Sequence, residues 1–322
     1  MTIVVTGAAG FIGYHLSVKL LSQGQEVIGI DSLNDYYDVN LKQARLMHLR
    51  TFPSFHFILH DLSLGNLAPL LKEKPIETIV HLAAYAGVRY SLLQPQLYLE
   101  KNILGQLAIL DWARQQKKPP YIAYASSSSV YGNALPPFRE DVKDLTPLSP
   151  YAVSKRSAEL LSECYASLYG LNQSGLRFFT VYGPWGRPDM AYYKFASAII
   201  NDEKIKIFGD GTMRRDFTYI SDIIEGICAV IQKKSTGHRL YNLGNDQPLS
   251  VNDLIKSLEK ALGKEAICEY GPEQQGEVPI TWADLSLSRR ELGYRPLTSL
   301  EPGIEAFVTW YKDYATHVKM TS

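Results

Sequence analysis

The 322-residue sequence has little cysteine, and its three cysteines form no pattern. Cys164, Cys228 and Cys268 are far apart, odd in number and without the spacing of metal ligands. We therefore predict buried free thiols and no metal site, which fits a reducing compartment.

Long hydrophobic runs and an excess of charge are also lacking. No apolar run approaches the ~18 residues that a membrane-spanning helix needs, and because a strand-like segment opens the chain we expect no signal peptide. The 33 basic and 33 acidic side chains cancel, which argues against nucleic acid or a membrane surface as a partner. With 46% hydrophobic residues and no internal repeat, the composition predicts a soluble, globular, cytoplasmic protein.

What the sequence does contain is, first, a dinucleotide-binding pattern. Residues 3–5 are typical of a strand buried on both faces, and a glycine-rich turn at 7–13, a helix and a second buried strand at 27–30 follow. Glycines let a pyrophosphate approach the positive end of the helix dipole. Asp31 ends the second strand, where a carboxylate accepts hydrogen bonds from ribose hydroxyls and repels a 2′-phosphate. We predict NAD as cofactor rather than NADP; the alternative is a tight turn that binds nothing.

A strand–helix rhythm continues to about residue 177 and predicts an α/β fold with a Rossmann-type, doubly wound parallel sheet. Strands are expected at 55–59, 78–82 and 121–125, and a long helix at 102–112. Ligands bind outside the carboxyl ends of parallel strands. The serine run at 126–129, which ends the last of these strands, is therefore expected to face the cofactor, although four serines could also be a plain polar loop.

Tyr151 and Lys155 stand four residues apart just inside a predicted helix, so their side chains share one face. Given 21 tyrosines in 322 residues, about one such pair is expected by chance. The pair therefore indicates a functional site only if its surroundings support one. An ammonium beside a phenol favours the phenolate, which can take a proton from an alcohol. With the serine run next to it, the pair suggests a triad of serine, tyrosine and lysine.

These motifs resemble those of the extended short-chain dehydrogenase/reductases, in particular the nucleotide-sugar epimerases and dehydratases, over nearly the whole chain. Further matching segments are 81–84, 130–132, 176–183 and 214–222. The resemblance implies that NAD is held tightly, that Tyr151 is the base, and that Lys155 lowers its pKa and binds the nicotinamide ribose. The cofactor-binding residues that it implies are Gly7, Gly10, Phe11, Ile12, Gly13, Asp31, Ser32, Asn34, Lys42, Asp61, Leu62, Leu82, Ala83, Ala84, Asn102, Tyr151, Lys155 and Phe178.

The residues at the positions of the serine run distinguish the reactions that members of this group catalyse. In its 4,6-dehydratases, an Asp and a Glu follow the serine or threonine that assists the tyrosine, and in its decarboxylating UDP-xylose synthases the second of these is Glu. Here the assisting residue is Ser127, and Ser128 and Ser129 follow it. Neither carries a carboxyl group, so the resemblance implies hydride removal and return through a 4-keto sugar, which is epimerisation.

Within the group, the segments 31–38, 86–91 and 183–191 are similar to those of UDP-glucuronate 4-epimerases. In that family the arginine matching Arg187 faces the sugar carboxylate, a role that suits an arginine fork; a loop pair with Asp189 is the alternative. The resemblance implies that Arg215 contacts the pyrophosphate of the UDP-sugar and that Gln274 and Glu277 lie near the uridine. For Arg214 and Arg215 the alternative is a surface ion pair with Asp210 or Asp216. Tyr85 departs from the usual Gln, and Glu277 from the usual Asp. The substrate-binding residues implied are Ser127, Ser128, Ser129, Arg89, Thr180, Arg187, Arg215, Gln274 and Glu277.

We expect residues 1–177 to form the NAD-binding domain, with 216–263 partly returning to it through a strand near 240–244. Residues 178–215 and 264–322 would form a smaller, interleaved UDP-sugar-binding domain, with helices at 251–262, 283–292 and 304–314.

Helices near 102–116 and 152–168 carry apolar faces that in this family pair across a homodimer, although these faces could instead pack on the sheet. The expected activity is reversible, NAD-dependent conversion of UDP-glucuronate to UDP-galacturonate. The alternatives are a 4-epimerase of UDP-glucose or UDP-N-acetylhexosamines and a non-catalytic NAD-binding protein.

Overall fold

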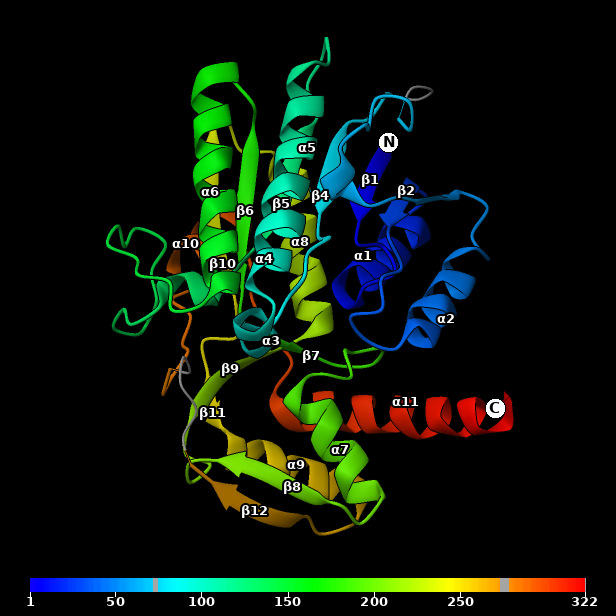
Figure 1. Cartoon of the computed structure of the whole chain (residues 1–322), viewed down its shortest axis with the longest axis vertical. Coiled ribbons are helices and arrows are strands. Elements are labelled where there is room, and N and C mark those ends of the chain that lie inside the picture. Colours follow the sequence, from blue (N-terminus) through cyan, green and yellow to red (C-terminus); the bar gives the residue numbers. More distant parts are fainter. Residues whose placement is uncertain (72–74, 273–277, 322) are drawn as a thin grey trace.

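A seven-stranded sheet forms the centre of the larger part of the molecule (Figure 1). The computed structural model describes residues 1–71, 75–272 and 278–321. The strand order is β10-β6-β5-β4-β1-β2-β3, and every neighbouring pair is parallel. The order reverses between β1 and β4, which is the position where doubly wound sheets bind their ligands. The strands are β1 (Thr2–Thr6), β2 (Glu26–Asp31), β3 (Phe55–Leu59), β4 (Thr78–His81), β5 (Tyr121–Ser127), β6 (Gln173–Phe178) and β10 (His238–Leu243).

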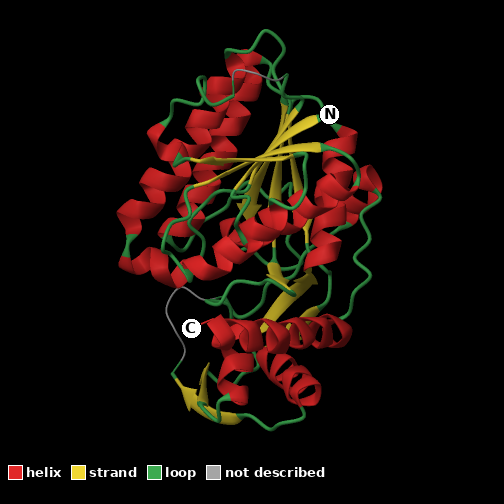
Figure 2. Cartoon of the chain, turned by 90° about the vertical axis from the view of Figure 1, so that its right-hand side faces the viewer, coloured by secondary structure: helices red, strands yellow, loops and turns green. Residues whose placement is uncertain are grey.

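Helices cover both faces of this sheet, as Figure 2 shows. Because both faces are covered, the central strands are apolar without alternation: all five residues of β1 are buried. One core lies under α1 (Phe11–Ser22), α2 (Val39–Leu49), α8 (Ile220–Lys233) and α10 (Ser286–Leu292). The other lies under α5 (Leu104–Arg114) and α6 (Pro150–Tyr169), next to the short α3 (Val88–Leu93) and α4 (Pro95–Tyr98). The predicted α/β, Rossmann-type fold is confirmed.

The smaller part lies beyond the carboxyl ends of these strands (Figure 1). It contains a three-stranded sheet, a two-stranded sheet and three helices that share a separate core. Its elements are β7 (Thr180–Tyr182), β9 (Arg214–Tyr219) and β11 (Pro248–Ser250), then β8 (Lys204–Phe208) and β12 (Ile267–Gly271), and finally α7 (Ala191–Ile200), α9 (Val251–Leu262) and α11 (Leu300–Thr321).

The chain crosses between the two parts more than once. The strand predicted near residues 240–244 is β10, which pairs in parallel with β6 and so returns to the main sheet. The helix predicted at 251–262 is α9, capped by the side chains of Ser250 and Asp253 and ended by Gly263 in the left-handed conformation. Of the described helices, none is long and apolar enough to cross a membrane.

Several boundaries differ from the predictions. The helix predicted from residue 283 begins at Ser286, because the backbone of Ala283 bridges to Phe138 and donates to the carboxylate of Asp216. The helix predicted at 304–314 is longer, from Leu300 to Thr321. The helix predicted from residue 102 is preceded by a π-helical turn, Leu99–Ile103.

The prediction of buried thiols holds for only one of the three cysteines. Cys228 is buried and Cys268 is half-buried, whereas Cys164 is exposed. Cys164 lies on the outward face of α6, whose opposite face, with Ala158, Glu159 and Ser162, is buried against the sheet.

Candidate active site

One cavity of about 1320 Å³ lies at the carboxyl ends of the parallel strands and is lined by residues from both parts of the molecule. It brings together almost all of the predicted site residues that the structure describes. The exception is Asn102, which is buried behind the wall and fixes the backbone of Tyr85 through hydrogen bonds of 2.8 and 3.0 Å. Gln274 and Glu277 lie outside the described residues.

The glycine-rich turn between β1 and α1 forms one wall of this cavity. Gly7 has φ +68°, and a Cβ there would lie 2.8 Å from the backbone nitrogen of Ala83. A Cβ on Gly13 would lie 2.0 Å from the carbonyl oxygen of Gly7. No side chain caps the helix at Gly10, so the first amides of α1 and the helix dipole are directed at the cavity. This cradle fits a pyrophosphate.

The carboxylate of Asp31 is fixed at the end of β2. It accepts hydrogen bonds from the backbone amides of Ala9 at 3.0 Å and Leu33 at 2.8 Å. Lys42 lies nearby and donates to the carbonyl and side-chain oxygens of Asn34 at 2.5 and 2.9 Å, while burial lowers its pKa to about 8. These groups fit the adenosine ribose of NAD, which the sequence predicts at this position.

Asp61 is held by a cation that the sequence analysis did not single out. Lys101, in the π-helical turn, lies 2.6 Å from its carboxylate. Burial raises the pKa of Asp61, but hydrogen bonds from Lys101 and Ser63 outweigh that effect and lower it. Asp61 therefore stays ionised at neutral pH.

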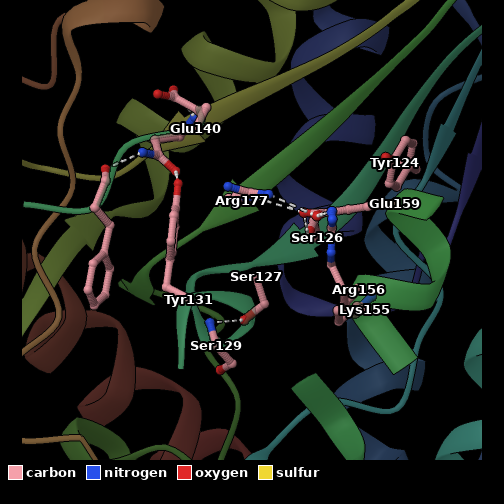
Figure 3. A network of polar contacts seen from close by, with 12 residues as sticks. Tyr124, Ser126, Ser127, Ser129, Tyr131, Glu140, Lys155, Arg156, Glu159 and Arg177 are labelled. Atoms are coloured by element: carbon pink, nitrogen blue, oxygen red, sulfur yellow. Dashed lines mark hydrogen bonds and ion pairs between the residues drawn. The ribbon is translucent and has the colours of Figure 1, made fainter. Parts of the chain in front are cut away.

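The serine run leaves β5 with alternate side chains on opposite sides, as a strand requires. Ser126 faces α6 and donates to the carboxylate of Glu159 at 2.6 Å, whereas the hydroxyl of Ser127 accepts from the amide of Ser129 at 3.2 Å (Figure 3). Both serines line the cavity. Glu159 is fully buried and receives two bonds from Arg177 on β6, at 2.8 and 2.9 Å. The end of β5 is thus tied to both neighbouring elements, and the position of Ser127 is fixed with it.

Tyr151 and Lys155 lie in the first turns of α6, behind the cap that Ser149 provides; Lys155 is buried and Tyr151 is half-buried. The ammonium of Lys155 donates to the carbonyl of Ala125 at 2.9 Å, and burial lowers its pKa to about 8. Burial raises the pKa of Tyr151, and the opposing effects come from a hydrogen bond with Ser127 and the charge of Arg187. Arg187 is thus a cation that opposes the effect of burial, and a lowering of the pKa of Tyr151 by Lys155 stays a prediction.

Arg187 lies in the loop between β7 and α7 and faces the cavity. Its Nε and Nη2 atoms bind the two carboxylate oxygens of Asp189 at 3.0 and 2.5 Å. The pair with Asp189, which the sequence left open as an alternative role, is therefore present. It uses one edge of the guanidinium, and Nη1 on the other edge is not part of it. Ser128, Ser129 and Thr180 line the same cavity.

Aromatic rings surround this loop. Tyr85, the departure from the usual Gln, meets Tyr36 edge-on at 5.6 Å and Tyr98 at 6.1 Å. Tyr36 and Tyr98 both donate to the carbonyl of Ala86, and Tyr98 meets Tyr151 at 6.0 Å. No sequence signal selects Tyr36 or Tyr98, since tyrosines are frequent in this chain and the convergence of these two depends on the tertiary fold.

Arg89 and Arg215, two further arginines predicted to bind the substrate, have different surroundings in the structure. Arg89 lies over the ring of Phe208 at 4.7 Å and so joins α3 to β8 across the cavity. Arg215 lines the cavity and donates to the carbonyl of Arg214 at 2.9 Å. Asp216, a possible ion-pair partner, is buried and accepts from the backbone amides of residues 245, 246 and 283 instead.

Comparison with known proteins defines the class. Residues 3–244 match the model of the NAD dependent epimerase/dehydratase family. The chain belongs to this family, and the predicted cofactor, NAD, is confirmed.

Several similar proteins have names that are more specific than that of the family. A UDP-glucuronate 4-epimerase of Thermodesulfobacterium geofontis is 44% identical, over 98% of both chains. UDP-glucuronate 4-epimerase 4 of Arabidopsis thaliana is also 44% identical, over 98% of this chain and 76% of the plant protein. The crystal structure of UDP-glucuronic acid 4-epimerase from Bacillus cereus with UDP-glucuronic acid and NAD has a TM-score of 0.93 and 38% identity, and the match covers 98% of this chain and 100% of that chain.

Proposed function

We propose that this chain is an isomerase, a UDP-glucuronate 4-epimerase, that interconverts UDP-glucuronate and UDP-galacturonate with tightly held NAD. The observation that carries the proposal is the content of one cavity. Ser127, Tyr151 and Lys155 lie there with Arg187, and positions 128 and 129, next to the assisting serine, hold no carboxyl group. The names of the similar proteins agree with this activity.

The chain supplies the acid–base chemistry. Tyr151 takes the proton of the sugar O4 and later returns it, while Ser127 donates a hydrogen bond that holds O4 in place. The hydrogen bond with Ser127 and the charge of Arg187 already work against the effect of burial on the pKa of Tyr151. Bound NAD supplies the hydride acceptor and donor for C4 and, when oxidised, a positive charge beside the base. Lys155 binds the nicotinamide ribose.

Arg187 selects the carboxylate of the hexuronic acid. Asp189 holds one edge of the guanidinium, and we assign the Nη1 edge, together with Ser128, Ser129 and Thr180, to the substrate. Planar guanidinium and carboxylate groups match each other in a two-bond arrangement. Arg215 binds the pyrophosphate of the UDP-sugar, and the roles proposed for Gln274 and Glu277 at the uridine remain predictions from the sequence.

We also propose a homodimer in which α5 and α6 of each subunit pair with those of the other. Apolar side chains are exposed there: Leu160 is 50% and Leu104 44% accessible. A small groove beside them is lined by Ile103, Ser157, Leu160, Leu161 and Cys164.

The division into an NAD-binding domain (1–177, with 216–263 partly returning) and a UDP-sugar domain (178–215 and 264–322) is also part of the proposal. So is a cytoplasmic location, which the free cysteines support.

Incubation of the purified protein with UDP-glucuronate, without added NAD, tests the activity. We expect UDP-galacturonate to accumulate to a constant ratio, reached equally from UDP-galacturonate. Tyr151→Phe keeps the ring packing but removes the base, and should lower the rate by about 10² to 10⁴. The proposal is wrong if neither substrate is converted even with added NAD, or if Tyr151→Phe is as active as the unmodified enzyme.

A further inference from the structure

Arg45, on α2, is a fully buried cation whose hydrogen bonds join three separate segments. Its Nη1 donates to the carbonyl of Ala9 at 2.9 Å and to the hydroxyl of Tyr37 at 2.7 Å. Its Nη2 donates to the carbonyls of Trp185 at 2.6 Å and Gly186 at 3.1 Å. All four Nη hydrogens are therefore engaged, whereas Nε has no hydrogen-bond partner within the described part of the chain.

A charge in such a position is costly unless it performs a task. Burial of an ion takes several kcal/mol, which good hydrogen bonds repay only in part. These four hydrogen bonds of Arg45 go to neutral oxygens, three of which are backbone carbonyls. An apolar side chain would pack at this buried position of α2 with a smaller free-energy cost. We therefore assign the role of Arg45 to the segments that its guanidinium joins.

One end of this arrangement is the loop that carries Arg187. Trp185 has φ +58°, a left-handed conformation that costs about 1 kcal/mol or more for a residue with a side chain. Such a conformation persists only where neighbours fix it. Arg45 binds the carbonyl of Trp185 itself and the next carbonyl, and His15 binds the carbonyl of Pro184 at 2.9 Å. Arg187 follows two residues later.

The other end is the cofactor turn. Ala9 lies inside the glycine-rich turn, and its amide donates to the carboxylate of Asp31 while its carbonyl accepts from Arg45. Arg45 thus joins the loop directly to the turn, in addition to the contact that His15 on α1 makes with Pro184. Movement of either segment would break hydrogen bonds on the same guanidinium.

We propose that Arg45 is a positioning residue: it holds the loop of residues 183–190 against the cofactor turn and thereby sets the affinity of Arg187 for a substrate carboxylate. This inference rests on the proposed function, because it needs a hexuronic acid as ligand. Lysine cannot replace Arg45, since its three donors radiate from one atom and cannot reach four acceptors on three segments.

Equilibrium binding of UDP and of UDP-glucuronate tests this role. Titration calorimetry would use the NAD-containing holoenzyme in a Tyr151→Phe background, so that the sugar is not converted. Arg45→Lys should weaken binding of UDP-glucuronate by about tenfold, the loss expected when one charge-assisted hydrogen bond is misplaced. Binding of UDP, which lacks the sugar, should change by less than about twofold. The amount of NAD released from each variant and the midpoint of thermal unfolding of each variant would be measured alongside these affinities.

Arg50→Lys is the matched control, because Arg50 caps the same helix but lies over Phe57, away from the loop; it should leave both affinities unchanged. The Arg45→Lys effect should also disappear in an Arg187→Ala background, since the residue acts through Arg187. If Arg45→Lys does not fold, Arg45→Gln, which removes the buried charge, carries the same expectation.

Two results overturn the inference: equal losses for UDP and UDP-glucuronate, or no loss for either. A protein with intact Arg45 that binds UDP-glucuronate no more tightly than UDP would instead contradict the proposed function.

Discussion

Arg187 decides, in our account, which sugars the cavity favours. The guanidinium is largely buried, and the adjacent carboxylate of Asp189 raises its pKa despite that burial. Because Asp189 fixes one edge, the other edge is held in place before a substrate arrives. Binding energy is then not spent on ordering the side chain.

Arg187→Ala should therefore lower kcat/KM for UDP-glucuronate by about 10- to 100-fold, the loss of a charge-assisted pair, and lower that for UDP-glucose much less. Steady-state assays with both substrates measure the difference. Because Arg187→Ala also leaves the carboxylate of Asp189 without its partner, Asp189→Asn would be assayed beside it as a companion variant. Equal losses on both substrates would remove the carboxylate role and favour an epimerase of neutral sugars.

At the residue scale the sequence was most informative where a motif is local. Residues 7–13, Asp31 and the pair Tyr151–Lys155 could be located before the fold was known, because each lies at a strand end or within one helical turn. Arg45 could not, although one signal was present: it occupies a core-facing position of α2 beside Leu46. A charge on an apolar helix face marks a buried role, but not its partners.

At the scale of elements, β1 and β4 flank the point where the strand order reverses. The hydroxyl of Thr6 lies 2.8 Å from His81 Nδ1 and accepts from the amides of Leu82 and Ala83. These contacts place the end of β4 against Gly7, where a Cβ would have no room. The junction that forms the cofactor turn thus contains a buried imidazole.

This junction should make the protein sensitive to acid. Burial, and secondarily the charge of Lys155, lower the pKa of His81 to about 3 in the folded state, against 6.5 for the free side chain. Between these values the unfolded chain binds a proton that the folded chain does not, so stability is full above pH 6.5 and is lost as pH falls toward 3. The free energy of unfolding, from urea titrations, should fall by about 1.4 kcal/mol per pH unit through this group.

His81→Asn should flatten that dependence by about one proton, whereas the same change at His56, which is exposed on β3, should not. An unchanged slope in His81→Asn would show that His81 is already protonated in the folded protein.

Element boundaries were less predictable than element types. The periodicity identified α6, α9 and β10, but not the start of α10, because Ala283 is drawn into contacts with Phe138 and Asp216 that come from distant parts of the chain. The π-helical turn before α5, which supplies Lys101 to Asp61, had no signal in the sequence either.

At the scale of the whole molecule, the exposed apolar side chains of α5 and α6 are the surface on which the proposed dimer depends. The sequence could not distinguish packing on the sheet from pairing between subunits. In the structure the helices use one face for the sheet and leave Leu104, Val153 and Leu160 exposed on the other.

Leu160→Glu should therefore shift the protein from dimer to monomer in sedimentation velocity measurements, because a charge in a buried apolar contact is strongly unfavourable. Leu135→Glu is the control, because Leu135 is 88% exposed in a loop; it should leave the mass of the sedimenting species at that of the dimer. A protein that is monomeric without any substitution, or a Leu160→Glu variant that stays dimeric, would place the interface elsewhere or remove it.

The central claim is that the hydrogen at C4 of a UDP-hexuronic acid leaves and returns inside the cavity. UDP-glucuronate carrying deuterium at C4, converted in ordinary water without added NAD, tests this claim directly by nuclear magnetic resonance of the product. We predict UDP-galacturonate that retains the deuterium at C4, with no label released to water. Loss of the C4 label to solvent, or product that has exchanged at C5 instead, would contradict the account.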